Sequence, residues 1–251
     1  MDQPQSIRLN KFLAERLGLS RREADEAIVA GRVKIGDTVA QLGARVDFTS
    51  KVWYNGNIIP FNTDYLYIAF NKPVGYVCSR RAQGGAPTVY DLLPAKYRQL
   101  KTVGRLDKDS SGLIILTNDG DFAYQMTHPK FHKDKVYEVE LDRPLEPLHQ
   151  QMISDYGVML DDGPSKFTVI KNEPAVSPAK DHKLGRAPSS ASEAGGTRAH
   201  YIVKLSEGRN RQIRRTFAAL GYRVTALHRT QFGPYQLAGL ATGRYEEIAK
   251  A

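Results

Sequence analysis

The residues of this chain that can carry out chemistry gather in one charged loop. The stretch 103–120, VGRLDKDSSGLIILTNDG, places Arg105, Asp107, Lys108 and Asp109 between two apolar segments. A carboxylate between basic neighbours stays ionised at neutral pH, so Asp107 can act as a nucleophile or as a general base. Asp109 precedes the sequence SSG, which favours a turn in which the carboxylate hydrogen-bonds its own backbone. Asp107 is therefore the candidate reactive group of this loop.

Common catalytic and cofactor motifs are missing from the sequence. The chain contains no GxxxxGK[ST] phosphate loop, no GxGxxG dinucleotide loop and no HExxH zinc motif. His128 and His132 are four residues apart, but no cysteine lies nearby to complete a zinc site. The single cysteine, Cys78, is expected to be a small buried apolar residue. The sequence predicts no metal ion and no cofactor.

Composition and charge narrow the class of protein. With 251 residues, of which 41% are apolar, the chain is long enough to form a substantial hydrophobic core. It has 36 Lys and Arg against 27 Asp and Glu, a net charge of +9, which favours a polyanionic partner such as nucleic acid. It has no apolar run long enough to cross a bilayer, and MDQPQSIRLNKF lacks the apolar region of a secretory signal. We expect no membrane association and a cytoplasmic location.

The first 61 residues (1–61) are expected to fold as a small domain of two helices and a short sheet. Apolar residues at helical spacing precede Gly18, which ends the first predicted helix. Ser20 and Glu23 form the pattern of a capping box that begins a second helix. The alternating segment that follows is interrupted by GD at 36–37 and NG at 55–56, as expected for hairpins of short strands.

The basic residues of this small domain suggest its partner. They crowd the predicted helices and the first strand, and those we expect to bind RNA are Arg8, Lys11, Arg21, Arg22, Arg32 and Lys34. A basic helix pair can also be a solvated surface, so charge alone leaves both interpretations open. However, LNKFLAERLGLSRREADEAIVAGRVKIGDTVAQLGARV resembles the RNA-binding module named after ribosomal small-subunit protein four. The resemblance implies that this domain binds RNA.

Residues 62–251 are expected to form a larger domain of the α+β class with a mixed or antiparallel sheet. The predicted strands are 65–79, 111–118 and 135–141, and the first of them runs into a turn at Lys72-Pro73 and Gly75. The predicted helices are 88–93, 147–157 and 210–221. Segment 173–199 is poor in large apolar residues and rich in Ala, Ser, Pro and Gly, so we expect a flexible insertion between two strands.

Three separated segments of this larger domain resemble one enzyme family in order and spacing. They are GRLDKDSSGLIILTNDGDFAYQMTHP at 104–129, KVYEVEL at 135–141 and EGRNRQIRRTFAALGYRVTALHRT at 207–230. They are similar to the successive motifs of the RsuA/RluB-type rRNA pseudouridine synthases. The resemblance implies a pseudouridine synthase that isomerises a specific uridine of ribosomal RNA without any cofactor.

The resemblance also implies roles for individual residues. Asp107 corresponds to the catalytic aspartate, Tyr137 to the tyrosine that stacks on the target base, and Arg214 to the basic residue that pairs with the aspartate. Arg105 corresponds to the arginine that enters the RNA helix when the target nucleotide is flipped out. Asp107 can attack C1′ of the ribose or remove the 2′ proton to give a glycal, and the sequence leaves both routes open.

The remaining expectations concern three further arginines, two alternative functions and the oligomeric state. Arg209, Arg211 and Arg215 are expected to contact rRNA phosphates. One alternative function is a non-catalytic ribosome-associated RNA-binding or assembly factor that retains the fold of the enzyme. Another is a glycosidase in which Asp107 and Asp109 act as a pair of carboxylates. Because no heptad repeat or large apolar stripe indicates self-association, we expect a monomer.

Overall fold

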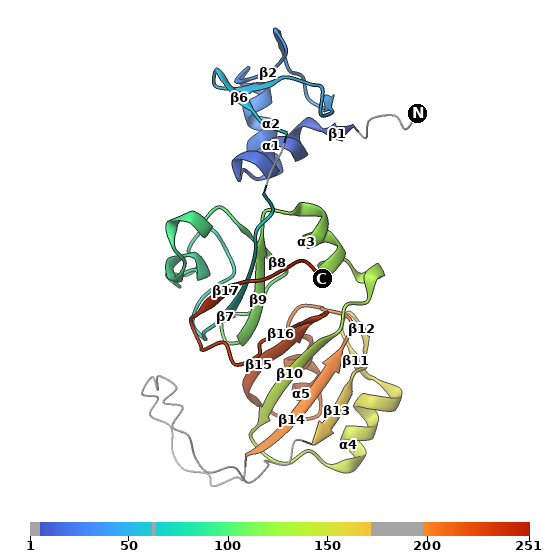
Figure 1. The fold of residues 1–251 in the computed structure, drawn as a ribbon. Coiled ribbons are helices and arrows are strands. Elements are labelled where there is room, and N and C mark those ends of the chain that lie inside the picture. The colour runs from blue at the N-terminus through green and yellow to red at the C-terminus, as the bar shows by residue number, and fades with distance from the viewer. Residues whose placement is uncertain (1–5, 62–63, 172–197) are drawn as a thin grey trace.

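The computed structural model describes residues 6–61, 64–171 and 198–251, and its ribbon is drawn in Figure 1. Most of the expected insertion 173–199 lies outside the described residues. Its predicted end is wrong, because Ala199 is already the first residue of a strand.

The N-terminal unit has the predicted two helices and short strands. Its helices are α1 (Leu9–Leu17) and α2 (Arg21–Val29). Its strands are β1 (Ile7–Arg8), β2 (Val33–Ile35), β3 (Thr38–Val39), β4 (Arg45–Val46), β5 (Val52–Tyr54) and β6 (Asn57–Ile59). β1 pairs with β4, and the other four form one antiparallel sheet in the order β3-β2-β5-β6.

Local sequence signals explain why this unit folds as it does. Gly18 follows α1 with φ 70°, a left-handed conformation in which glycine has no steric penalty. The capping box is formed, because Ser20 Oγ accepts from the Glu23 N–H and the Glu23 carboxylate accepts from the Ser20 N–H. The apolar faces of both helices and of the sheet share one core that includes Phe12, Ala24 and Val52.

The larger unit is built on one twisted mixed sheet, which runs through the centre of Figure 1. Its strands are β7 (Tyr67–Lys72), β8 (Lys101–Val103), β9 (Ser111–Thr117), β10 (Lys135–Leu141), β13 (Thr168–Lys171), β14 (Ala199–Leu205), β15 (Val224–Phe232), β16 (Tyr235–Gln236) and β17 (Tyr245–Glu247). The main order is β13-β14-β10-β15-β9-β7-β17, and β15 and β9 are the parallel pair. The predicted α+β class and mixed sheet are confirmed.

Helical segments cover both faces of this sheet. Successive residues of β9 enter opposite cores, Ile114 with the Ile213 and Phe217 side of α5 (Gln212–Ala219), and Ile115 with the Phe122 side of α3 (Gly120–Thr127). The larger core also includes Ile153, which follows α4 (Pro147–Gln151), and residues of two 3-10 helices at Val89–Leu92 and Ala95–Tyr97. A small hairpin, β11 (Val158–Leu160) and β12 (Gly163–Ser165), packs against α5.

Several predicted elements differ from the structure. The strand expected within 65–79 begins at Tyr67 and ends at Lys72, at the predicted turn, and the helix expected at 88–93 is a 3-10 helix. The helix expected at 147–157 is α4 followed by a π-helical turn at Met152–Tyr156. The Asp-Gly pair at 119–120 begins α3 as well as ending a strand, because Asp119 Oδ1 accepts from the N–H groups of the first helical turn.

The two units touch through a few polar contacts. Lys11 Nζ of α1 lies 2.6 Å from Asp121 Oδ1 at the start of α3. Lys101 Nζ of β8 donates to Leu19 O at 2.8 Å, beyond the C-terminal end of α1, where cations are stabilised by free carbonyl groups. Within the described part of the chain, none of the helices has the length and apolarity needed to span a bilayer.

Candidate active site

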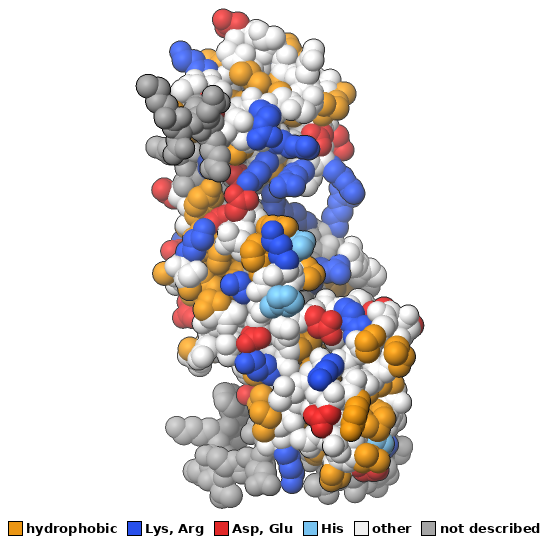
Figure 2. Space-filling model, turned by 90° about the vertical axis from the view of Figure 1, so that its right-hand side faces the viewer, with side chains coloured by type: hydrophobic (Ala, Val, Ile, Leu, Met, Phe, Trp, Pro, Cys, Tyr) orange, Lys and Arg blue, Asp and Glu red, His pale blue; other side chains and the backbone are white. Residues whose placement is uncertain are grey.

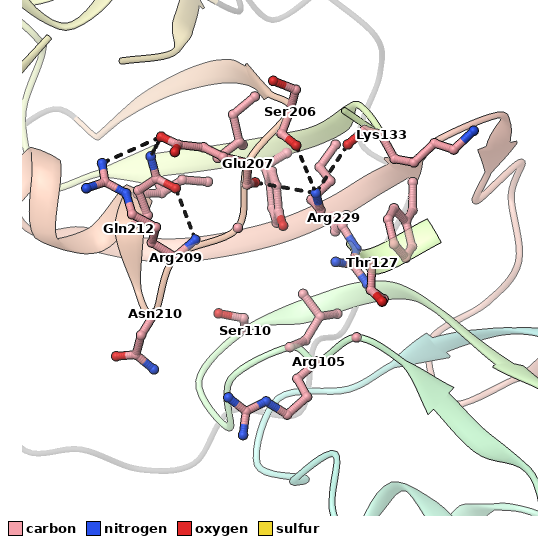
Figure 3. Close-up of a pocket in the computed structure, with 18 of the residues that line it drawn as sticks. Arg105, Ser110, Thr127, Lys133, Ser206, Glu207, Arg209, Asn210, Gln212 and Arg229 are labelled. Carbon is pink, nitrogen blue, oxygen red and sulfur yellow. Dashed lines mark hydrogen bonds and ion pairs between the residues drawn. The ribbon is translucent and has the colours of Figure 1, made fainter. Parts of the chain in front are cut away.

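A pocket of about 440 Å³ opens where the 104–110 loop faces strands β10 and β15. Its walls also include the end of α3 and the segment from Leu205 to Ile213, and a close-up is drawn in Figure 3. The predicted residues Arg105, Asp107, Tyr137, Arg209 and Arg211 all line it. The volume is within the range of about 300–1,000 Å³ common for small-molecule sites. One nucleotide is therefore a suitable occupant.

Asp107 lies in the loop between β8 and β9, where the chain leaves one strand and returns to the next. The Ser110 N–H donates to Asp107 O at 3.1 Å, which closes a tight turn. The Asp107 side chain keeps 34% of its surface exposed, so the carboxylate can reach a bound molecule.

Lys72, which was predicted only as part of a turn, holds the backbone of this loop in place. Its side chain is fully buried, and Nζ donates to three carbonyl oxygens, Pro73 O at 2.9 Å, Asp107 O at 3.0 Å and Ser110 O at 2.6 Å. Burial lowers the pKa of Lys72 to about 8. The lysine thus fixes the backbone that carries Asp107.

Arg211 is the cation that meets the two carboxylates of the loop. Its Nη1 and Nη2 bind Asp109 Oδ1 and Oδ2 at 2.9 and 2.7 Å, and its Nη1 lies 3.8 Å from Asp107 Oδ2. The hydrogen bond from Arg211 lowers the pKa of Asp109, which keeps that carboxylate ionised. The interpretation of Asp109 as only a turn residue was incomplete.

Arg214 was expected to pair with Asp107, and the structure directs its contacts elsewhere. Arg214 Nη2 donates to Asp109 O at 2.7 Å, Nη1 donates to Val224 O at 2.9 Å, and Nε lies 3.4 Å from Asp109 Oδ2. The reason is helical position, because Arg211 immediately precedes α5 and faces the loop, whereas Arg214 lies one turn further along.

Two of the cations expected on phosphates are bound by carboxylates of the chain itself. Arg215 contacts Asp161 and Asp162 at 2.5 and 2.7 Å, and Arg209 contacts Asp162 at 2.9 Å. Both carboxylates lie in the turn between β11 and β12. RNA contacts by Arg209 and Arg215 stay a prediction, and they require these exposed ion pairs to rearrange.

A row of register partners across the sheet brings four key residues together. Tyr137 of β10 pairs with Arg229 of β15, Arg229 pairs with Gly112 of β9, and Gly112 pairs with Lys72 of β7. Gly112 has φ 106°, and a Cβ atom there would lie 2.2 Å from Arg229 O. Only glycine allows the strands to approach this closely. Arg229 was not among the site residues predicted from the sequence.

The predicted RNA-binding residues outside the pocket lie mostly on the surface. Arg8, Arg21, Arg22, Arg32 and Lys34 are exposed and make no ion pair with another residue that the structure describes. Lys11 differs, because it is half-buried and bound to Asp121. Figure 2 shows Lys and Arg side chains gathered over the N-terminal unit and continuing onto the unit below it.

The possible metal ligands and the single thiol can be located in the structure. No group of three or more His, Cys, Asp and Glu side chains suited to a metal ion occurs in residues 6–61, 64–171 and 198–251. The Cys78 thiol accepts a hydrogen bond from the Leu106 N–H at 3.4 Å, and burial raises its pKa, which keeps it protonated.

Comparison with known sequence families assigns both units. The family described as RNA pseudouridylate synthase matches residues 66–219, and the S4 domain matches residues 7–58. The first match includes Asp107, Tyr137, Arg211 and Arg214, and stops before Arg229.

Individual proteins resemble nearly the whole chain. Ribosomal large subunit pseudouridine synthase B of Pseudomonas aeruginosa is 35% identical over 98% of this chain, which spans 60% of that relative's length. Ribosomal small subunit pseudouridine synthase A of Pasteurella multocida is 34% identical over 97% of this chain and 96% of its own length. A solved structure described as a pseudouridylate synthase matches 97% of this chain and 96% of its own, at 28% identity and a TM-score of 0.63.

Proposed function

The chain belongs to the RNA pseudouridylate synthase family, and we propose that it isomerises a specific uridine of ribosomal RNA to pseudouridine, with Asp107 as the catalytic carboxylate. The reaction breaks the bond between C1′ and N1, turns the uracil in the pocket and joins C1′ to C5.

The observation that carries this proposal is the placement of Asp107. Its carboxylate borders a pocket of nucleotide size together with Tyr137, and the nearest cation is Arg211 at 3.8 Å. A partly exposed carboxylate can either attack C1′ or take the 2′ proton, while the neighbouring guanidinium keeps it oriented. Tyr137 is 8% exposed and supplies an aromatic wall on which a flipped-out base can stack.

The geometry argues against hydrolysis by a pair of carboxylates. Glycosidases of that kind need one protonated carboxyl group as general acid. Asp109 is bound through both oxygens by Arg211, and that hydrogen bond lowers its pKa. An ionised, doubly bound Asp109 cannot serve as the acid, so isomerisation by Asp107 alone fits this site better.

Each of the two units has its own role in this proposal. We assign RNA binding to residues 1–61 and catalysis to residues 62–251, with rRNA lying along the exposed cations of β1, α2 and β2. Such cations attract any RNA through its phosphates, whereas the pocket accepts one extruded nucleotide. Arg105 is exposed at the pocket rim, where its side chain can fill the space that the flipped nucleotide leaves. Figure 3 shows Arg105 on the loop side of the pocket, across from Asn210 and Gln212.

The test is conversion of unmodified rRNA by the purified protein without metal or nucleotide, mapped by chemical labelling of pseudouridine. Asp107→Asn should lower the single-turnover rate by about 10⁴-fold while rRNA binding is unchanged. Asp109→Asn, which removes one carboxylate that holds Arg211, should cost only about 10-fold.

Three outcomes contradict parts of the proposal. Conversion by Asp107→Asn at the rate of the unaltered protein would remove Asp107 from the chemistry. Release of free uracil would indicate a glycosidase. Binding of rRNA with no conversion by the unaltered protein would leave the ribosome-associated binding factor as the function.

We also propose that the protein acts in the cytoplasm as a monomer, on free rRNA or on a pre-ribosomal particle. The proposal of a monomer rests on the sequence, which has no heptad repeat that would indicate self-association. Light scattering of the purified chain tests this, and a concentration-dependent dimer mass would contradict it.

A further inference from the structure

We infer that Arg229 is a further catalytic residue, which donates a hydrogen bond from its free Nη2 to a carbonyl oxygen of the uracil ring as the glycosidic bond breaks. The inference rests on the proposed function and adds a residue outside the segment matched by the synthase family.

Arg229 is a buried cation with an unused donor. It is 2% exposed, and its Nε donates to Leu113 O at 2.8 Å. Its guanidinium lies over the Phe232 ring, 4.7 Å from the ring centre, which fixes its orientation. Its Nη2 is buried and has no hydrogen-bond partner among the described residues.

Leaving such a group unpaired is costly. A buried polar donor without a partner costs about 1–3 kcal/mol, and more when it is charged. Native structures tolerate few such groups, and those they retain commonly serve a site. Because Arg229 lines the pocket that holds Asp107, a molecule bound there can supply the missing acceptor.

The sheet register places Arg229 beside the residue on which the base is proposed to stack. Tyr137 and Arg229 are direct partners on the antiparallel strands β10 and β15. Opposed residues of such a pair project from the same face of a sheet, with Cβ atoms about 4.5–5.5 Å apart. A ring that packs against Tyr137 therefore comes within reach of the Arg229 guanidinium. In Figure 3 Arg229 lies between Lys133 and Thr127, on the opposite side of the view from Asn210.

The reaction places negative charge on the uracil, which can accept a hydrogen bond from Arg229. When the bond from C1′ to N1 breaks, both electrons leave with the uracil, and the negative charge spreads over N1 and the carbonyl oxygens O2 and O4. Asp107 compensates at the sugar, either by bonding to C1′ or by taking the 2′ proton. After rotation, C5 bonds to C1′ as the bond from Asp107 to C1′ breaks or, on the glycal route, as C2′ regains its proton from Asp107. C5 then loses its proton and N1 gains one, so no outside reactant is consumed.

A fixed cationic donor stabilises that charge most strongly at the moment it develops. Removing one preorganised donor to an oxyanion typically costs about 10²–10³-fold in rate. Lys135 adds to the positive field, because its Nζ also lines the pocket and its pKa is lowered by burial and by Arg229. The Lys135 ammonium already donates to carbonyl oxygens of Lys133, Ser206 and Glu207, whereas the buried Nη2 of Arg229 has no partner among the described residues.

The test compares Arg229→Gln with Arg143→Gln in single-turnover conversion of rRNA. Arg143 is a matched control, because its guanidinium also donates to one carbonyl, Gly221 O at 2.8 Å, and also lies 4.7 Å from an aromatic ring centre, that of Tyr222. We expect Arg229→Gln to lower the rate by about 10²-fold with unchanged rRNA affinity, and Arg143→Gln to leave it unchanged.

Chemical rescue separates this role from a structural one. In Arg229→Ala, added guanidinium ion at low, non-denaturing concentration should restore part of the rate, whereas urea, which has a similar shape and no charge, should not. A wild-type rate in Arg229→Gln, or equal effects of guanidinium and urea, would overturn the inference. If the unaltered protein converts uridine and Arg229→Gln does too, only this inference fails. If the unaltered protein converts none, the proposed function fails first.

Discussion

The N-terminal unit and the pocket use charge in opposite ways. Around α1 and α2, exposed arginines such as Arg21 and Arg22 make no ion pair with other described residues, so their charge is available to a large polyanion. Around Asp107, apart from the exposed Arg105 at the rim, several charges are buried or bound, as in Lys72 on three carbonyls and Arg211 on Asp109. This difference indicates that RNA binding uses charge that is accessible to solvent, whereas catalysis uses charge that is held in one orientation.

Among the variants of the pocket region, Gly112→Ala is expected to have the largest effect on stability. A Cβ atom there would lie 2.2 Å from Arg229 O, in a residue with φ +106°, so strands β9 and β15 must separate. We expect a loss of about 4 kcal/mol in the free energy of unfolding, measured by urea denaturation.

Gly43→Ala in the N-terminal unit is the matched control. Gly43 has φ +83° with nothing within 4 Å of the added atom, so only the backbone penalty of about 1–2 kcal/mol applies. Equal losses in the two variants would show that close strand approach is not what requires Gly112.

The burial of Lys72 predicts a pH dependence of stability. Its pKa is about 8 in the folded protein against an ordinary value of 10.5, so between these pH values the unfolded chain binds a proton that the folded chain lacks. The free energy of unfolding therefore rises with pH across this window, by about 3 kcal/mol from this group.

The measurement is the difference in unfolding free energy between the unaltered protein and Lys72→Met, followed from pH 8 to pH 10.5. The subtraction removes the titration of all other groups. A difference that stays flat over this range would mean that the Lys72 ammonium is not held in a desolvated site.

The accessibility of the cations in the N-terminal unit is tested by the salt dependence of rRNA binding. Arg21→Gln combined with Arg22→Gln should weaken rRNA binding uniformly and reduce the slope of log Kd against log salt by about 2. Arg215→Gln removes a charge already held by Asp161 and Asp162, so the slope should change much less. A larger change from Arg215 than from the Arg21 and Arg22 pair would reverse the contrast between accessible and bound cations.

The smallest expected effect concerns the start of α2. Ser20→Ala removes the acceptor for the Glu23 N–H and should lower the free energy of unfolding by about 1 kcal/mol, measured by thermal denaturation. Single-turnover conversion should be unchanged once the variant is folded. A changed catalytic rate with unchanged stability would contradict a purely structural role for this cap.

The sequence alone predicted most features that depend on neighbours along the chain. The end of α1 at Gly18, the capping box at Ser20, the hairpin turns and strand β10 are all local patterns, and the structure has them. The sequence also singled out Asp107 and Tyr137, because a charged loop and a motif resemblance can be read from linear order. Where local signals compete, as at Asp119, the prediction missed a helix, since the same Asp-Gly pair suits a turn and an N-cap.

Tertiary structure alone decided which charged groups meet. Arg211 and Asp109 are 102 positions apart, so only the approach of the α5 segment to the 104–110 loop shows that Arg211 contacts both Asp107 and Asp109, whereas the contacts of Arg214 go to Asp109. Lys72, Gly112 and Arg229 are equally distant in sequence and become neighbours through the register of β7, β9 and β15. The physical reason is that charge is useful only at a defined distance and burial, and both are properties of packing between segments far apart in the chain.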